Sequence, residues 1–157
     1  MEAIFSQVCS DPNVQFTSDD VEKWMEKIDG SLYNYLEGKT TSIIEQEKEE
    51  ALLSILDNDV RDRMKESLVM YRLVGDLQDA RLGRYCRWIT EKEGKQTLHS
   101  GGYLVKIIFS DKGVSLLCER AKKYKMQLKM DETSVFQKMT AEEWVVVMAN
   151  NYSEKEK

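Results

Sequence analysis

The residue types that most often carry out catalysis are scarce in this chain. Its 157 residues include one histidine, His99, and three cysteines, Cys9, Cys86 and Cys118. A catalytic triad or an imidazole acid–base pair needs a histidine, and a cysteine nucleophile needs a base beside it. His99 lies in the polar sequence Leu-His-Ser-Gly-Gly, which is typical of a turn. We therefore expect no enzyme activity and no catalytic residue.

A zinc site and a phosphate loop are the two ligand sites that these residues could form. A Cys3His zinc site would need all three cysteines and His99, but structural zinc ligands usually come in pairs two to four residues apart, and no such pair exists here. Ser100-Gly101-Gly102 lacks the lysine and the helix of a phosphate loop, and is better explained as permissive backbone before a strand. The odd number and wide spacing of the cysteines favour reduced thiols over disulfides. We expect no metal, no cofactor and no small-molecule substrate.

Basic and aromatic side chains are concentrated in residues 81–138, where 13 basic residues outnumber 6 acidic ones. Such a mixture can bind single-stranded nucleic acid, because cations hold phosphates while aromatic rings stack on bases. The same surface could instead bind a protein. The candidate binding residues are Arg81, Arg84, Tyr85, Arg87, Trp88, Arg120, Lys122, Lys123, Lys125 and Lys129.

A simpler interpretation is that these cations line the solvent face of strands, or meet acidic residues elsewhere in the chain. Residues 1–79 have a net charge of −10 and residues 80–157 a net charge of +5, so the two halves could attract each other. The sequence pI of about 5.1 also weighs against a dedicated duplex-binding protein, which is commonly basic throughout.

The first half of the chain has the periodicity of helices. Thr17-Ser18-Asp19-Asp20 supplies a cap and first-turn acids in front of apolar residues at helical spacing from Val21 to Ile28. Residues 31–37, residues 42–56 and a segment from Val60 toward Gly75 complete three to four predicted helices. Residues 1–16 contain the only proline and are expected to form a short turn or an arm.

After Gly75 the hydrophobic period changes from 3.6 toward 2. Alternation in residues 84–90, 103–109, 114–119, 124–130 and 135–138 predicts four to five short strands with turn residues between them. Strands of this length and spacing favour a small curled antiparallel β-sheet or an SH3-like barrel. Thr140 then caps a C-terminal helix, which we expect to pack on the barrel or on the N-terminal helices.

These patterns predict an α+β protein in two parts that are docked as one unit. The parts are an acidic helical lobe at residues 1–76 and a basic small β-barrel module with a C-terminal helix at residues 77–157. No segment reaches the roughly 18 apolar residues of a membrane span. The N-terminus lacks the basic start and the apolar stretch of a secretory signal. We therefore expect an intracellular protein with no membrane association.

Three stretches of the sequence resemble small uncharacterised proteins of large nucleocytoplasmic DNA viruses. The stretches are Gly83-Arg-Tyr-Cys-Arg-Trp-Ile, Leu98-His-Ser-Gly-Gly-Tyr-Leu-Val and Val135-Phe-Gln-Lys-Met-Thr-Ala-Glu-Glu. The resemblance covers roughly residues 59–144 and brings no catalytic motif with it. It implies a viral protein that acts in the host cytoplasm or in the virion, as a virion component or as an assembly or replication accessory.

We expect a non-enzymatic protein-interaction or structural module, with a protein partner or self-association. The alternative is an accessory protein that binds single-stranded nucleic acid through the basic, aromatic face of the β-module.

Overall fold

The computed structural model describes residues 18–121 and 124–155, and the arm expected at residues 1–16 lies outside them. The chain forms two compact units, each of which is described by itself. The helical unit consists of residues 1–47 and 139–157, and the sheet unit of residues 48–138. This division differs from the expected one at residue 76, because residues 48–76 belong with the strands and the C-terminal helix belongs with the N-terminal helices.

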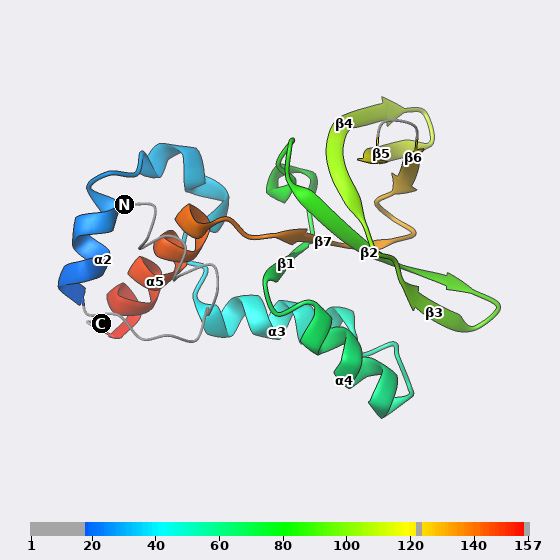
Figure 1. Cartoon of the computed structure of the whole chain (residues 1–157), viewed down its shortest axis with the longest axis horizontal. Coiled ribbons are helices and arrows are strands. Elements are labelled where there is room, and N and C mark those ends of the chain that lie inside the picture. The colour runs from blue at the N-terminus through cyan, green and yellow to red at the C-terminus, as the bar shows by residue number, and fades with distance from the viewer. Residues whose placement is uncertain (1–17, 122–123, 156–157) are drawn as a thin grey trace. The chain divides into compact units, whose positions relative to one another are not determined.

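The helical unit is organised around its C-terminal helix. It contains α2 (Ser18–Met25), the 3₁₀ helix η1 (Gly30–Leu36), the first part of α3 (Thr41–Ala51) and α5 (Ala141–Lys155) (Figure 1). Five apolar side chains of α5 are almost completely buried, namely Trp144, Val145, Val146, Val147 and Met148. Burial of a side chain of this size contributes about 1.5–3 kcal/mol. The C-terminal helix was expected to pack either on the barrel or on the N-terminal helices. In the structure it packs on the N-terminal helices.

Polar contacts fix the ends of α5. The Thr140 N–H donates to Glu143 Oε1 over 2.9 Å and the Glu143 N–H donates to Thr140 Oγ1 over 3.2 Å, which is a capping box at the start of the helix. The Tyr35 hydroxyl donates to Glu143 Oε2 over 2.7 Å, and the Tyr33 hydroxyl donates to Glu142. Nearer the other end, Asn150 Nδ2 donates to the carbonyl of Leu36, the last residue of η1, and to the carbonyl of Lys39. These bonds hold η1 along α5.

The sheet unit contains one helix followed by seven antiparallel strands. Its elements are α4 (Asn58–Ser67), β1 (Tyr71–Val74), the 3₁₀ turn η2 (Leu77–Asp79), β2 (Tyr85–Lys92), β3 (Lys95–Leu98), β4 (Gly102–Ser110), β5 (Gly113–Arg120), β6 (Tyr124–Lys129) and β7 (Ser134–Lys138). The strand order is β1-β7-β2-β4-β5-β6, and β3 pairs with the far end of β2. In the described residues β1 and β6 are the two edges, so the sheet is curled but open and does not close into the barrel that was the other expected form. β4 is strongly bent, and β5 and β6 continue the sheet beyond the bend (Figure 1).

The two faces of this sheet bury different clusters. One cluster lies inside the curl and contains Val74, Ala80, Cys86, Trp88, Leu104, Leu116, Cys118, Leu128 and Val135. The other lies on the opposite face of β1, β2 and β7 and joins Tyr71, Ile89 and Phe136 to Leu52, Ile55, Met64 and Leu68. Both faces of the central strands β2 and β7 are therefore buried, while β4, β5 and β6 bury only the inner face.

Two segments differ from the sequence-based expectation. The helix predicted from Val60 toward Gly75 ends at Ser67, and Tyr71–Val74 is the edge strand β1, paired with β7. Helical spacing alone could not reveal this, because a strand partner 64 residues away supplies the backbone hydrogen bonds of β1. Residues 91–98 lie where turn residues were expected between two strands, but they form a hairpin whose arms are the end of β2 and all of β3. Glu93 and Gly94 both have positive φ there, as a tight hairpin turn requires.

Among the described helices, none combines the length and the apolar character needed to cross a membrane.

Candidate functional site

A buried hydrogen-bond network joins β1, β2 and β7 in the sheet unit. Gln137, 1% exposed, accepts from Arg72 Nη2 over 2.9 Å and from the Arg81 N–H over 3.0 Å. Its Nε2 donates to the Arg81 carbonyl over 2.9 Å and to Cys86 Sγ over 3.3 Å. Arg72 Nη2 also donates to the Asp79 carbonyl over 2.7 Å. The backbone N–H and carbonyl of Arg81, one of the predicted binding residues, are thus both hydrogen-bonded to the buried Gln137 side chain. The network stabilises the fold.

Three further predicted binding residues hold the connection between β3 and β4. The Tyr85 hydroxyl donates to the Ser100 carbonyl over 2.7 Å, and Arg87 Nε donates to the His99 carbonyl over 2.9 Å. Arg120 Nη1 donates to Ser100 Oγ. Their hydrogen-bonding groups are therefore engaged in fixing a turn.

The same turn contains His99, whose ring is packed, and Gly101, where the backbone geometry requires a glycine. The His99 ring stacks on Trp88 with centroids 5.9 Å apart, and its Nε2 lies 2.7 Å from Thr90 Oγ1. A Cβ atom on Gly101 would lie 2.2 Å from a β2 carbonyl oxygen, and the φ of Gly101 is +102°. The Ser-Gly-Gly sequence therefore permits a close crossing of β2, as the sequence indicated.

Trp88 is the one predicted binding residue whose ring the structure removes from the surface. It is 2% exposed and lies inside the curl, because Cys86 and Trp88 alternate with Tyr85 and Arg87 along β2. The prediction that Trp88 could stack on a ligand is wrong for this fold. Arg84 is half-buried, and Lys122 and Lys123 lie outside the described residues.

The remaining predicted cations, Lys125 and Lys129, lie on a surface that the sequence did not delimit. Strand register places Tyr103 beside Glu119 and Lys125, Lys106 beside Leu117 and Gln127, and Ile108 beside Ser115 and Lys129. Residues paired in this way share one face of a sheet, and here it is the face that points away from the curl. We call this set, with Val105 at the bulge of β4, the outer face.

The outer face combines exposed apolar groups with exposed lysines. Tyr103 is 56% exposed and Val105 42% exposed, while Ile108 and Leu117 are half-buried between them. Lys106, Lys125 and Lys129 are exposed, and Glu119 is the only carboxylate in the set. The Tyr103 ring makes an edge-to-face contact with Tyr85 at 5.1 Å, which restricts its movement.

Tyr103, Val105 and Lys106 were not among the predicted site residues. The alternation of residues 103–109 put Tyr103 and Val105 on one face, but the bulge between Leu104 and Lys106 shifts the register, so that Lys106 joins Tyr103 on the outer face. Only the strand pairing could show this, because a bulge leaves no clear mark in a single sequence.

The two described cysteines are buried free thiols in the inner cluster, in line with the prediction of reduced thiols. A hydrogen bond with Cys118 lowers the pKa of Cys86, and the hydrogen bond from Gln137 and the charge of Arg72 act in the same direction against burial. The same contact with Cys86, together with burial, raises the pKa of Cys118. Both thiols therefore belong to the inner core cluster.

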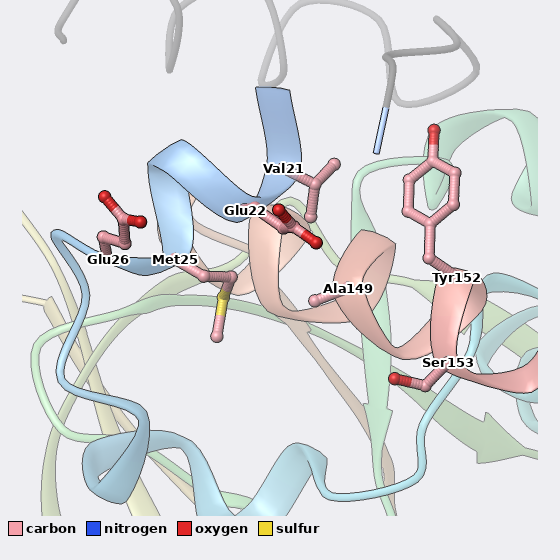
Figure 2. Close-up of a pocket in the computed structure, with 7 residues that line it drawn as sticks. All are labelled: Val21, Glu22, Met25, Glu26, Ala149, Tyr152 and Ser153. Atoms are coloured by element: carbon pink, nitrogen blue, oxygen red, sulfur yellow. The ribbon is translucent and has the colours of Figure 1, made fainter. Parts of the chain in front are cut away.

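The helical unit contains a pocket of about 470 Å³ between α2 and α5. It is lined by Val21, Glu22, Met25, Glu26, Ala149, Tyr152 and Ser153. Figure 2 shows the Glu22 carboxylate between the two helices, close to Ala149, and the Tyr152 ring standing on α5. The pocket therefore combines apolar groups with carboxylates.

A second, more polar pocket of about 340 Å³ lies in the sheet unit near the β2–β3 hairpin. Hydroxyl and carboxylate side chains such as Thr90, Glu91 and Asp131 line it. Within residues 18–121 and 124–155, no three histidine, cysteine or acidic side chains are grouped so that they could hold a metal ion.

Comparisons with protein-family models, with curated proteins and with solved structures found no match to this chain.

Proposed function

We propose that this chain is a non-enzymatic protein-interaction module that binds its partner through the outer face of β4, β5 and β6. The observation that carries the proposal is the exposure of Tyr103 and Val105 beside three exposed lysines on one face of the sheet. Buried aromatic anchors with charged residues around them are what protein interfaces typically use. The partner surface is therefore expected to be apolar at its centre and acidic at its rim.

The face, rather than the edge of the sheet, is the proposed contact. β6 is an edge strand, and lysines on an edge strand discourage pairing with another strand. The inner face of the same strands is filled by the core cluster. A partner therefore meets the side chains of the outer face and not the backbone of β6.

The resemblance to small proteins of large nucleocytoplasmic DNA viruses favours a partner in the virus particle or in its assembly. This part of the proposal rests on the three sequence stretches that carry the resemblance.

Affinity capture with matched charge variants tests the proposed face. Lys125→Glu/Lys129→Glu removes two cations of the outer face, whereas Lys92→Glu/Lys95→Glu makes the same charge change in the β2–β3 hairpin, where both lysines are exposed. Proteins that bind the outer face should be captured by the wild type and by the hairpin variant. The amount captured by the outer-face variant should be about tenfold lower, because two charged contacts are lost. Equal capture by all three chains would contradict the proposal.

Binding of single-stranded nucleic acid is the second candidate, and exposed tyrosine rings next to lysines favour it. Tyr103 lies on the outer face, and Tyr124, 58% exposed, begins β6 beside Lys125. Stacking of one base on an aromatic ring contributes about 1–3 kcal/mol, so Tyr103→Ala should weaken binding of a labelled 20-nucleotide single strand by roughly 5- to 150-fold. Affinity should also fall steeply with salt. If fluorescence anisotropy detects no binding at low salt, this second function is excluded.

A further inference from the structure

The pocket between α2 and α5 has the chemistry of a site for a cationic side chain with an apolar stem. Val21, Met25 and Ala149 supply apolar groups to it, and Glu22 and Glu26 supply carboxylates. Figure 2 shows the Glu22 carboxylate between α2 and α5, close to Ala149. A lysine side chain matches both parts, because its methylene stem can lie on apolar groups while the ammonium reaches carboxylates.

The electrostatics of the pocket favour a positive charge from three directions. Glu22 and Glu26 are one helical turn apart, where like charges repel, and neither forms an ion pair within the described part of the chain. Tyr152 and Ser153 belong to the last turn of α5, where the carbonyl end of the helix is partially negative. The Tyr152 ring adds an aromatic face for a cation. A bound ammonium would relieve the repulsion between the two glutamates.

The chain itself carries a surface that is complementary to this pocket. The helical unit has 14 acidic and 5 basic residues, whereas the sheet unit has 14 acidic and 18 basic ones. On the sheet unit, the outer face presents Lys125 and Lys129 two residues either side of Gln127, next to exposed Tyr103. Lysines beside an apolar centre are the counterpart of carboxylates beside apolar groups.

We propose that the α2–α5 pocket of one copy receives lysines from the outer face of a second copy, so that the chain associates with itself head to tail. This inference rests on the proposed function, since it names a second copy as the partner of the outer face. The two surfaces are different, so the contact is heterologous, and a pair of bound copies leaves one pocket and one outer face available. The assembly therefore grows beyond a dimer unless it closes into a ring.

Sedimentation velocity of the purified full chain over a range of concentrations tests this. In low salt the mean sedimentation coefficient should rise with concentration past that of a dimer, and about 0.5 M salt should reverse the rise, because the contact depends on charge. Glu22→Lys/Glu26→Lys should weaken association at least tenfold. The matched control Asp62→Lys/Glu66→Lys reverses two exposed acids one turn apart on α4 and should leave association unchanged.

A mixing experiment separates this contact from general charge effects. Glu22→Lys/Glu26→Lys alone has a basic pocket and a basic face, and Lys125→Glu/Lys129→Glu alone has an acidic pocket and an acidic face, so neither should self-associate. An equimolar mixture should associate, because the intact lysines of the first variant meet the intact pocket of the second. Circular dichroism spectra identical to that of the wild type show that both variants are folded.

The outcomes distinguish this inference from the proposed function. Three results would overturn the head-to-tail contact. The wild type could be a monomer at every concentration, the α4 control could lose as much association as the pocket variant, or mixing the two variants could fail to restore association. If the wild type then still captures proteins that the outer-face variant loses, the proposed function stands with another partner. If capture fails as well, both are refuted.

Discussion

Replacing Gln137 should destabilise the sheet unit more than any other single polar substitution in the network around it. Gln137→Met keeps the volume of the side chain but removes four hydrogen bonds, those with Arg72, with the N–H and the carbonyl of Arg81, and with Cys86. Arg72 retains its bond to the Asp79 carbonyl, so the groups left without this partner are chiefly the Arg81 backbone and one guanidinium N–H.

The expected loss follows from the partners that remain. A buried polar group that loses its partner costs about 1–3 kcal/mol, and such costs within one network do not simply add. We expect a decrease of about 3–5 kcal/mol in the free energy of unfolding, which is a large part of the 5–15 kcal/mol, roughly, that a domain has in total. With a urea m-value of about 2 kcal/mol/M, the unfolding midpoint should fall by about 2 M.

Urea unfolding followed by fluorescence and by far-UV circular dichroism measures this change. Native-state hydrogen exchange of β1 and β7 amides locates it in the sheet unit. Lys138→Gln, at the exposed residue after Gln137, is the control and should stay within about 0.5 kcal/mol of the wild type. The double variant Arg72→Met/Gln137→Met should lose less than the two single changes together, since the bond between Arg72 and Gln137 is counted in both single changes and no guanidinium is left without Gln137. A loss below about 1 kcal/mol for Gln137→Met would refute the reasoning that this network holds the strands together.

Three further changes test other parts of the fold. Gly101→Ala should lower the melting temperature far more than Gly30→Ala, because only the former places a Cβ 2.2 Å from a backbone oxygen, in a conformation with φ of +102°. Thr140→Ala removes the capping box of α5 and should cost about 1 kcal/mol in urea unfolding. Burial raises the pKa of Tyr71 above its ordinary value of 10.0, so this residue contributes stability that is present below pH 10 and is lost as the pH rises through the folded-state pKa. Tyr71→Phe should therefore reduce the fall in stability above pH 10, and an unchanged slope would contradict the assignment.

The sequence was sufficient for the elements whose patterns are local. The capping sequence at Thr140, the alternation of residues 124–130 and the turn at residues 111–113 each gave the element that the structure contains. What failed depended on partners distant in the chain. Tyr71–Val74 has side chains that suit a helix and a strand equally, and its pairing with β7 decides the matter.

The candidate site shows the same limit. Composition identified the basic, aromatic segment, but it could not separate Arg87 and Arg120, which clamp a turn, from Lys125 and Lys129, which face outward. The pocket between α2 and α5 could not be predicted at all, because its two walls are more than a hundred residues apart in the sequence. The spacing of Glu22 and Glu26 was visible, but it is equally typical of an ordinary exposed helix face.

Arginines and lysines have different places in the sheet unit, and this difference predicts how the outer face binds. Arg61, Arg63, Arg72, Arg81, Arg87 and Arg120 all donate to acceptors within the sheet unit. On the outer face the cations are lysines, and Lys129 forms a 3.8 Å ion pair with Glu132. A guanidinium has several donors in a fixed plane and suits a defined geometry, whereas an ammonium is a strongly hydrated point charge on a flexible stem.

A surface built from lysines around Tyr103 should therefore select its partner by charge and apolar fit more than by fixed hydrogen-bond geometry. Its binding should be reversible and sensitive to salt, and Lys125→Arg should preserve it while Lys125→Glu should not.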